Sequence, residues 1–445
     1  NEGGQIRFNV PKDYGAGAVT LHAKYLNDHN GWFEFYPAKD FNDPKIAPGI
    51  DRFATNLHRP GKFSYVTGAV DQEREFDPES LAHSVQKSVG VEWTHDFGDG
   101  WVLSNNFKVS DSTTRWNTSA SVALRDIGRG SLFSNLNSLS TGPNRVPAGE
   151  WIFRDRSTGQ VMARVLSDGT NSGSGGAGTT GLTVLENNLP RQDLLTGAVW
   201  SNNGLVFDRY AKEAMNQLTL NKRIENHLFT IGSFYAYSDA ANFNTTAGRT
   251  VAPVGSNPQP LDVTLITAAG SPYGAGQTLQ ITNPQGFAAE GSGFTLNEFL
   301  QKQLSLFFGH NWEINKRLTL DWGVRYEDLS VSGLNNLGSA NPNANYDPSF
   351  GGADGNPLTI YDNRFNVRNA VDWVYDRSLD SFSWSGALNY TIDPNNSVYV
   401  RYTEGEKAPD LSFFTGLTNA FAIANYATTP QTIAQWEIGY KFRRG

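Results

Sequence analysis

Two groups of residues have the types and spacing to hold a small molecule. The first places four aromatic rings around one carboxylate inside the segment 29–41: Trp32, Phe33, Glu34, Phe35 and Tyr36. Aromatic faces stack on flat ligands such as sugars, and a few polar groups fix a ligand's orientation. The second group combines three carboxylates with one amine: Glu404, Glu406, Lys407 and Asp410. We predict that both contact a substrate; a loop packed on itself and a rim of solvated salt bridges are the alternatives.

The sequence lacks the residue patterns of the common enzyme classes and metal sites. It has no cysteine, which excludes a thiol nucleophile, a thiolate metal site and a disulfide framework. Its seven histidines are scattered and form no His-Glu-x-x-His pair. The glycine-rich segment 173–178 lacks the Gly-Lys-Ser/Thr of a phosphate loop, and 393–396 lacks the carboxylates of a calcium loop. We therefore expect a protein that is not an enzyme and needs no metal or cofactor.

Charge and hydropathy narrow the class further. The 36 basic and 44 acidic residues give a formal net charge of −8, which argues against a nucleic-acid partner. No run of about 18 apolar residues could form a transmembrane helix. The mean hydropathy of −0.44 still suits a transmembrane β-barrel, because only every second residue of a barrel strand faces lipid.

The dominant pattern of the chain is an alternation of apolar and polar residues with a period of two, which predicts β-strands. The segment 318–329 is the clearest case, and 303–314 before it alternates in the same way. Five hairpins are predicted, each around a short turn such as 11–16: 4–10 with 17–26, 85–96 with 101–110, 214–223 with 228–238, 303–314 with 318–329, and 381–392 with 397–404. A last strand, 432–442, is predicted without a partner after it.

The connections between these hairpins are long: 27–84, 111–213, 239–302, 330–380 and 405–431. Short and long connections therefore alternate strictly, as they do in outer-membrane barrels with short turns at one end and long loops at the other. Strands of about 10 residues also match a tilted membrane crossing. Inside the connection 111–213, the segments 151–156 and 160–165 are predicted to form a further hairpin.

The two faces of these strands predict different surroundings. Aromatic residues on the apolar faces are expected to form a membrane girdle: Trp312, Trp322, Tyr326, Trp384, Tyr390, Trp436 and Tyr440. Polar residues on the opposite faces are expected to line a wet lumen: Asp321, Arg325, Glu327 and Arg401. The core of a soluble sandwich is the alternative, but a dry core would not accept such a row of charges.

Three C-terminal segments resemble TonB-dependent outer-membrane receptors. LTLDWGVRY at 318–326 is similar to their L-T-L-x-x-G-x-R-Y-E strand. SVYVRYTEGEKAPDL at 397–411 resembles a second segment of the family, but this chain has Glu406-Lys407 where the family usually has Phe-Arg. PQTIAQWEIGYKF at 430–442 resembles another strand of the family, with Gln431 and Trp436 in place of Glu and Tyr. The N-terminal segments 3–7, 24–28 and 99–105 are similar to early barrel strands of a proteobacterial subgroup.

The resemblance implies an all-β transmembrane antiparallel barrel of 22 strands around an N-terminal plug. It also implies energy-coupled uptake of a scarce small molecule, such as a carbohydrate or a siderophore, across the outer membrane of a Gram-negative bacterium. The expected partners are outer-membrane lipid and lipopolysaccharide, and the TonB complex through a missing N-terminal region. A passive porin-like barrel and a secreted β-sandwich lectin or adhesin remain as alternatives.

The number of predicted strands indicates an incomplete barrel. Eleven is an odd number of strands, whereas bacterial single-chain barrels have an even number of strands. We therefore expect residues 1–445 to be part of a barrel domain, without its plug and last strands. The fold class expected is an open, strongly curved sheet whose first and last strands have unpaired edges.

Overall fold

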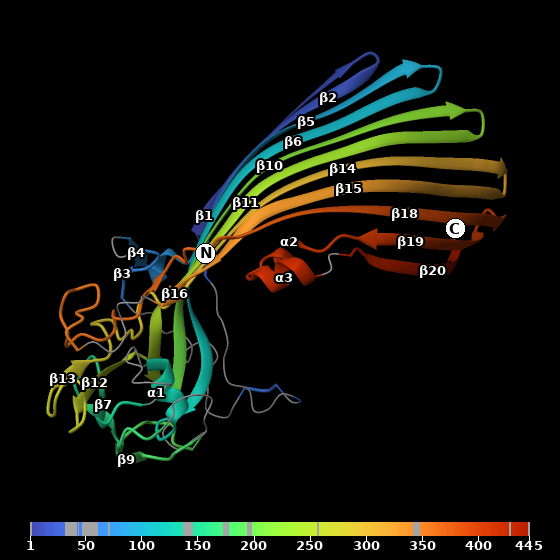
Figure 1. Ribbon diagram of the computed structural model, residues 1–445. Helices are drawn as coiled ribbons and strands as arrows, with labels where there is room; N and C mark the ends of the chain where they lie inside the picture. Colours follow the sequence, from blue (N-terminus) through green and yellow to red (C-terminus); the bar gives the residue numbers. More distant parts are fainter. Residues whose placement is uncertain are drawn as a thin grey trace.

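Eleven antiparallel strands form one open sheet in the computed structural model, which describes residues 2–31, 42, 44–46, 61–69, 72–136, 146–171, 178–193, 198–255, 258–340, 348–426 and 429–443. The strands follow each other in chain order: β1 (Glu2–Tyr14), β2 (Gly17–Asn30), β5 (Ala82–Gly98), β6 (Trp101–Asp126), β10 (Ala198–Ile224), β11 (His227–Pro253), β14 (Gly293–Asn315), β15 (Leu318–Leu337), β18 (Trp373–Asp393), β19 (Asn396–Lys407) and β20 (Gln431–Phe442). Figure 1 shows the sheet bent into an arch with the short turns at one end.

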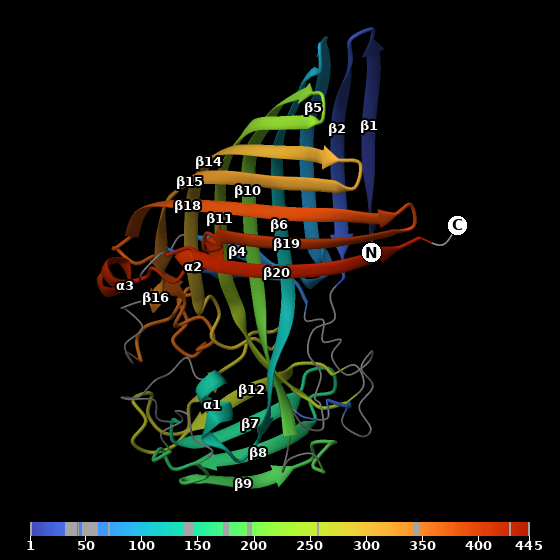
Figure 2. The same cartoon turned by 90° about the vertical axis from the view of Figure 1, so that its right-hand side faces the viewer.

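The edges of the sheet confirm the predicted open barrel wall. β1 pairs with β2 and β20 pairs with β19, and these two outer strands do not pair with each other. Figure 2 shows how far the sheet turns, because β1 and β2 stand upright in this view while β18, β19 and β20 lie across it. All five predicted hairpins and the single last strand are present.

Most strands are longer than the sequence pattern predicts. β10 and β11 pair over nearly their whole lengths, far beyond the predicted segments 214–223 and 228–238. Toward the long connections both faces of a strand are covered, as at the consecutive buried residues Thr250, Val251 and Ala252 of β11, so the alternation fades although the backbone hydrogen bonds continue. The predicted turn at 11–16 is wrong, because Pro11 pairs with Thr20 inside β1. Proline is tolerated there since β1 is an edge strand.

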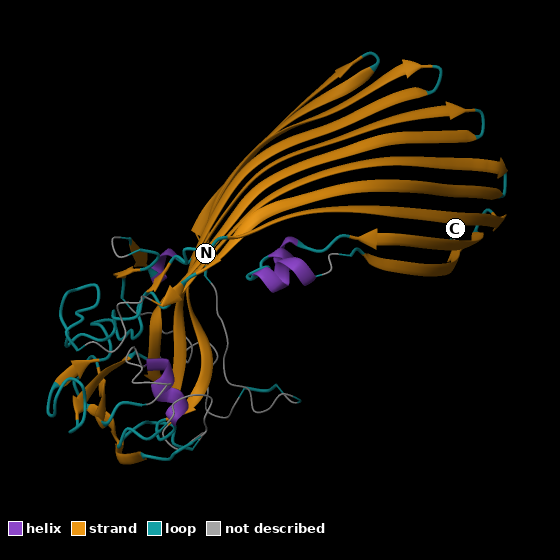
Figure 3. Ribbon diagram, viewed as in Figure 1, coloured by secondary structure: helices purple, strands orange, loops and turns teal. Residues whose placement is uncertain are grey.

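A second, smaller sheet lies among the long connections and was predicted only in part. Its order is β13 (Thr278–Gln280), β12 (Leu261–Thr267), β7 (Gly149–Asp155), β8 (Val161–Ser167) and β9 (Leu182–Asn187). The β7–β8 pair confirms the predicted loop hairpin. The fully buried core beneath this sheet includes Trp151, Phe153 and Phe133, the last from α1 (Gly130–Leu136). Figure 3 shows this second sheet and α1 below the large arch.

Short elements complete the connections. They are β3 (Phe63–Val66), β4 (Glu73–Phe76), the 3-10 helix η1 (Pro78–Ser80), β16 (Ser339–Ala340), β17 (Asn366–Val367), α2 (Leu411–Phe414) and α3 (Ala420–Asn425). In the part of the chain that the structure describes, no helix is long and apolar enough to span a membrane.

Candidate functional site

The strand register gives the large sheet two chemically different faces. Trp322, Gly386 and Tyr402 are direct neighbours on successive strands, and Tyr402 in turn pairs with Trp436, so these residues share one face. Arg325 and Glu327 lie on the other face, opposite Phe307 and Ser305 of β14. We name these the apolar face and the polar face. α2 and α3 pack on the polar face, and Figure 1 shows them inside the arch, so the polar face is the concave one.

All seven predicted girdle residues lie on the apolar face: Trp312, Trp322, Tyr326, Trp384, Tyr390, Trp436 and Tyr440. Histidines join this aromatic surface near the short turns. The indole Nε1 of Trp322 donates to His310 Nδ1 at 3.1 Å, and His310 Nε2 lies 3.0 Å from His227 Nδ1. Large side chains remain open to the surroundings, with Trp436 72% and Tyr440 61% exposed. Their position in a membrane girdle stays a prediction.

The four predicted lumen residues share the polar face. Arg325 Nη2 donates to Glu327 Oε2 at 2.9 Å and to Ser305 Oγ at 2.8 Å. Asp321 accepts a 3.4 Å hydrogen bond from Asn311, and Arg401 lies in the same row, separated from it by Ala387. The concave wall thus presents fixed charges and hydrogen-bonding groups to whatever occupies the space beside it.

A depression of about 370 Å³ extends this polar wall across β2, β5, β6, β10 and β11. Its polar-face lining was not predicted and includes His22, Glu92, Asn106, Lys108, Gln217 and Phe234. His22 Nδ1 lies 2.9 Å from Asn9 Oδ1, and its Nε2 lies 3.3 Å from Glu92 Oε1. Such a mixture of a ring, an amine, amides and a carboxylate can hold a polar organic molecule. The alternation of apolar and polar residues along the predicted strands could have assigned these side chains to the polar face.

The connection 408–426 folds inward and covers part of the polar face. Phe414, Leu417 and Ala422 pack against a cluster that includes Phe299, Val331 and Tyr375. Asn335, which is fully buried, donates to the carbonyl oxygens of Phe414 at 2.7 Å and Leu417 at 3.0 Å. The guanidinium of Arg377 donates to the carbonyl of Ile423. These apolar contacts and hydrogen bonds hold the segment against the concave face of the sheet.

The structure separates the predicted group at 404–410. Glu404 and Glu406 lie on the apolar face, where Glu404 accepts from Tyr402 at 2.7 Å and Glu406 accepts from the backbone of Phe382 at 3.0 Å. Lys407 and Asp410 form an exposed ion pair at 3.1 Å. These four side chains therefore do not converge on one point of the polar face. The aromatic cluster 32–36 lies outside the described residues.

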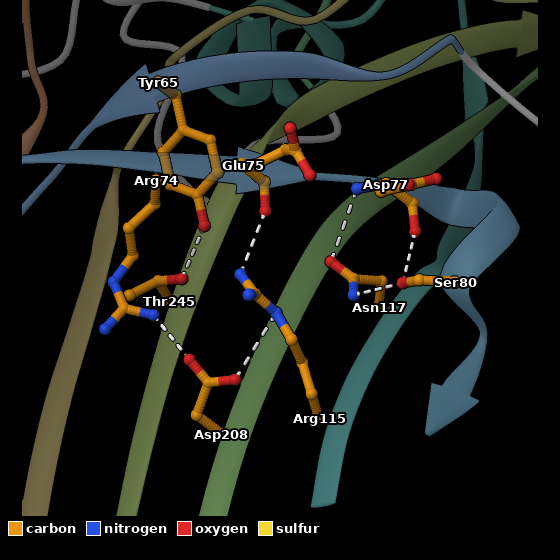
Figure 4. A network of polar contacts seen from close by, with 9 residues as sticks. All are labelled: Tyr65, Arg74, Glu75, Asp77, Ser80, Arg115, Asn117, Asp208 and Thr245. Atoms are coloured by element: carbon orange, nitrogen blue, oxygen red, sulfur yellow. Dashed lines mark hydrogen bonds and ion pairs between the residues drawn. The ribbon is translucent and has the colours of Figure 1, made fainter. Parts of the chain in front are cut away.

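A polar network anchors the β3–β4 hairpin to the apolar side of β6, β10 and β11 (Figure 4). Arg74 donates to Asp208 Oδ2 at 2.5 Å, while the Nε of Arg115 lies 3.5 Å from Asp208 Oδ1. Arg115 also donates to the Glu75 carbonyl at 3.3 Å, and the buried Tyr65 hydroxyl lies 2.7 Å from Thr245 Oγ1. Burial raises the pKa of Tyr65 to about 12. No local pattern predicted these long-range contacts.

Two acids are buried among the long connections. Burial raises the pKa of Glu290 to about 8, although Asn283 donates a 2.6 Å hydrogen bond to its carboxylate. Burial likewise raises the pKa of Asp362 to about 6, although the backbone amides of Ala353 and Asp354 both donate to its Oδ2 at 2.8 Å. Among the described residues, no group of three or more acidic or histidine side chains could hold a metal ion.

Comparison with known proteins agrees with this architecture. The model of the family "TonB dependent receptor-like, beta-barrel" matches residues 154–445. The chain belongs to this family. The resemblance predicted from the three C-terminal segments is thereby confirmed, and the open eleven-stranded sheet is a wall of a TonB-dependent receptor barrel.

Solved structures of similar receptors have low sequence identity to this receptor barrel. The closed form of the ferric-catecholate import receptor Fiu from E. coli K12 is 13% identical, with a TM-score of 0.48, over 98% of this chain and 48% of Fiu. The siderophore receptor PiuA from Acinetobacter baumannii is 11% identical, with a TM-score of 0.44, over 98% of this chain and 46% of PiuA. The receptor barrel therefore spans about half the length of the solved structures that it matches.

Proposed function

We propose that this chain is part of the wall of an outer-membrane receptor of a Gram-negative bacterium, which takes up a scarce small molecule with energy supplied through the TonB complex. Membership of the TonB-dependent receptor family supports the proposal. The observation that carries it is the division of one continuous sheet into a polar concave face and an apolar convex face. Large exposed aromatic residues are unfavourable in water but are typical of a barrel surface in lipid.

The polar face is the proposed substrate side. The Arg325–Glu327–Ser305 cluster and the depression near His22 offer charges and hydrogen bonds, and the connection 408–426 lies above the same face. In the proposed mechanism, outer loops capture the substrate, the polar face and a plug hold it, and TonB pulling on the plug opens the passage. A ligand can hold the closed state only through its differential affinity for that state, so external work must overcome the binding energy.

The proposal extends to parts of the receptor beyond the described residues. Residues 1–445 are proposed as one section of a barrel domain that encloses a plug. The aromatic cluster 32–36 is a proposed substrate contact, and Lys407 with Asp410 a proposed rim contact. Since Glu404 and Glu406 lie on the apolar face, we do not place them in the substrate path. Carbohydrate and siderophore remain the two substrate classes considered, because loops and grafted side chains decide specificity within one barrel fold.

The test measures uptake by the complete receptor, expressed in cells from which its own gene has been deleted. Cells receive radiolabelled ferric siderophores in one series and radiolabelled oligosaccharides in another, with and without a functional TonB gene. We expect uptake of one class to require both the receptor and TonB. Uptake that persists without TonB would favour the passive porin-like barrel instead.

A pair of neighbouring variants tests the polar face itself. Arg325→Ala removes a charge from the proposed substrate wall, whereas Tyr326→Phe alters the adjacent residue on the apolar face. We expect Arg325→Ala to lower uptake about tenfold or more, corresponding to about 1.4 kcal/mol of lost interaction, and Tyr326→Phe to leave it unchanged. Equal uptake by both variants, at equal amounts of receptor in the outer membrane, would remove Arg325 from the substrate path.

A further inference from the structure

A hollow of about 490 Å³, which we name the sheet pocket, lies on one face of the second sheet. Phe153 and Val263 point from this sheet into its buried core. Successive residues of a strand point to opposite faces, so Arg154 and Asp262 lie on the other face, where both line the hollow. The volume falls within the range of about 300–1,000 Å³ that is usual for small-molecule sites. The lining includes six polar side chains: Arg154, Arg156, Asp262, Gln280, Thr359 and Tyr361.

Backbone hydrogen bonds build the sheet pocket from three different long connections. Arg154 of β7 and Asp262 of β12 are directly opposite each other in the sheet. The segment 357–361 lies beside β13, where the amide of Gln280 donates to the carbonyl of Leu358 and the amide of Ile360 donates to the carbonyl of Gln280, both at 2.8 Å. A site built on hydrogen-bonded strands is organised before a ligand arrives, which lowers the entropic cost of binding.

Several polar groups on the floor of the sheet pocket remain available to a ligand. Opposite charges that face each other across two antiparallel strands usually interact. Arg154 and Asp262 have this position, yet they form no ion pair, and among the described residues the Arg154 guanidinium has no hydrogen-bond partner. Within the same part of the chain the side chain of Gln280 has none either, and Asp262 accepts a single hydrogen bond, from Thr282 Oγ1 at 3.1 Å.

The open face of the sheet pocket carries more positive than negative charge. Arg156 adds a second guanidinium, whose Nη2 donates to a backbone carbonyl and to an amide oxygen and so keeps its charge uncompensated. Asp155 lies opposite the core residue Leu261, on the other face, and its Oδ1 accepts four hydrogen bonds from the turn 157–158. Two guanidiniums therefore accompany the single carboxylate of Asp262, which favours an anionic ligand.

We propose that the sheet pocket binds an acidic sugar, a pyranose ring that carries a carboxylate. The carboxylate pairs with the Arg154 guanidinium through two parallel hydrogen bonds. Ring hydroxyls donate to Asp262 and form hydrogen bonds with the amide of Gln280, while the Tyr361 ring packs on the apolar side of the sugar. The sheet pocket belongs to the second sheet and not to the polar face, so its occupation goes beyond the uptake proposed above and does not depend on it.

Other classes of ligand leave part of this lining unsatisfied. A neutral sugar leaves the charge of Arg154 without a partner, and a simple carboxylate such as acetate leaves Asp262 and Gln280 without one. Burial lowers the pKa of Arg156 and the Asp262 carboxylate opposes this, so these two groups are close. The ammonium group of an amino acid bound at Asp262 is therefore repelled by Arg156.

The test titrates the complete receptor, purified in detergent, with D-glucuronate and measures binding by isothermal titration calorimetry. We expect one saturable site, and we expect Arg154→Gln to weaken its affinity about 10- to 150-fold, the range for hydrogen bonds between charged groups. D-glucose, acetate and alanine are titrated in the same way, and each should bind about tenfold or more weakly than D-glucuronate. Equal affinity of Arg154→Gln and the unmodified receptor for D-glucuronate would overturn the site.

The matched control is Arg164→Gln. Arg164 lies opposite Ile152, on the same face of the second sheet as Arg154, but it pairs with Glu150 at 2.5 Å and lies outside the lining of the hollow. We expect this control to bind D-glucuronate like the unmodified receptor, and an equal loss would reduce the effect to general surface charge. The ligand series needs no variant, so it decides the question even if Arg154→Gln does not fold. D-glucose, acetate or alanine that binds as tightly as D-glucuronate would overturn the acidic sugar.

The same preparations separate this inference from the proposed function. TonB-dependent uptake by cells that express the same receptor is measured in parallel. A transporting receptor that does not bind D-glucuronate refutes the sheet pocket alone. A receptor that binds D-glucuronate but shows no TonB-dependent uptake of any substrate offered refutes the proposed function instead.

Discussion

The docking of the β3–β4 hairpin gives a prediction whose size can be worked out from the structure. Asp208 accepts a 2.5 Å hydrogen bond from Arg74 and pairs with Arg115 at 3.5 Å. The three side chains are 33%, 28% and 44% exposed, so solvent screens both pairs. A hydrogen bond between charged groups contributes about 1.5–3 kcal/mol before this screening. For Asp208→Asn we therefore expect the hairpin to lose about 1–2 kcal/mol of docking free energy.

The assay is hydrogen exchange of the complete receptor, read at the backbone amides of β3 and β4. A loss of about 1–2 kcal/mol increases the population of the undocked hairpin about 5- to 30-fold, and exchange should accelerate by the same factor. Glu73→Gln is the matched control, because Glu73 is an exposed acid on the same hairpin with no ion pair to a described residue. Unchanged exchange in Asp208→Asn, or equal acceleration in Glu73→Gln, would refute the anchoring role of Asp208.

Two further predictions concern the long connections. Glu290 has an ordinary pKa of 4.5 and a folded pKa of about 8, so ionisation of the unfolded chain weakens the fold around it as pH rises through this window. Protease resistance of that region should fall from pH 4.5 to 8, and Glu290→Gln should flatten the dependence; an identical pH profile in the variant would contradict this. Asn335→Ala leaves the carbonyls of Phe414 and Leu417 without their donor, at a cost of about 1–3 kcal/mol. Hydrogen exchange at 411–425 should accelerate at least fivefold, and protection equal to that of the unmodified receptor would count against it.

The large sheet was predictable because a membrane imposes a strict pattern on the residues that face it. Alternation located all eleven strands and placed all the predicted girdle and lumen residues on the expected faces. The same alternation predicts that Glu404 lies on the apolar face, because Val398, Val400 and Tyr402 precede it at intervals of two on that face. Glu404 lies near the end of β19 toward the long connection, where its carboxylate accepts a hydrogen bond from the Tyr402 hydroxyl.

The loop structure could not be predicted in the same way. β7 pairs with β12 across more than a hundred residues, and Trp151 is buried because Leu265 lies opposite it in a different connection. The contact between Arg74 and Asp208 likewise joins residues 134 positions apart. Such contacts depend on where the barrel brings the ends of distant strands together. No local pattern of residues encodes this, since loops face water and tolerate most polar sequences.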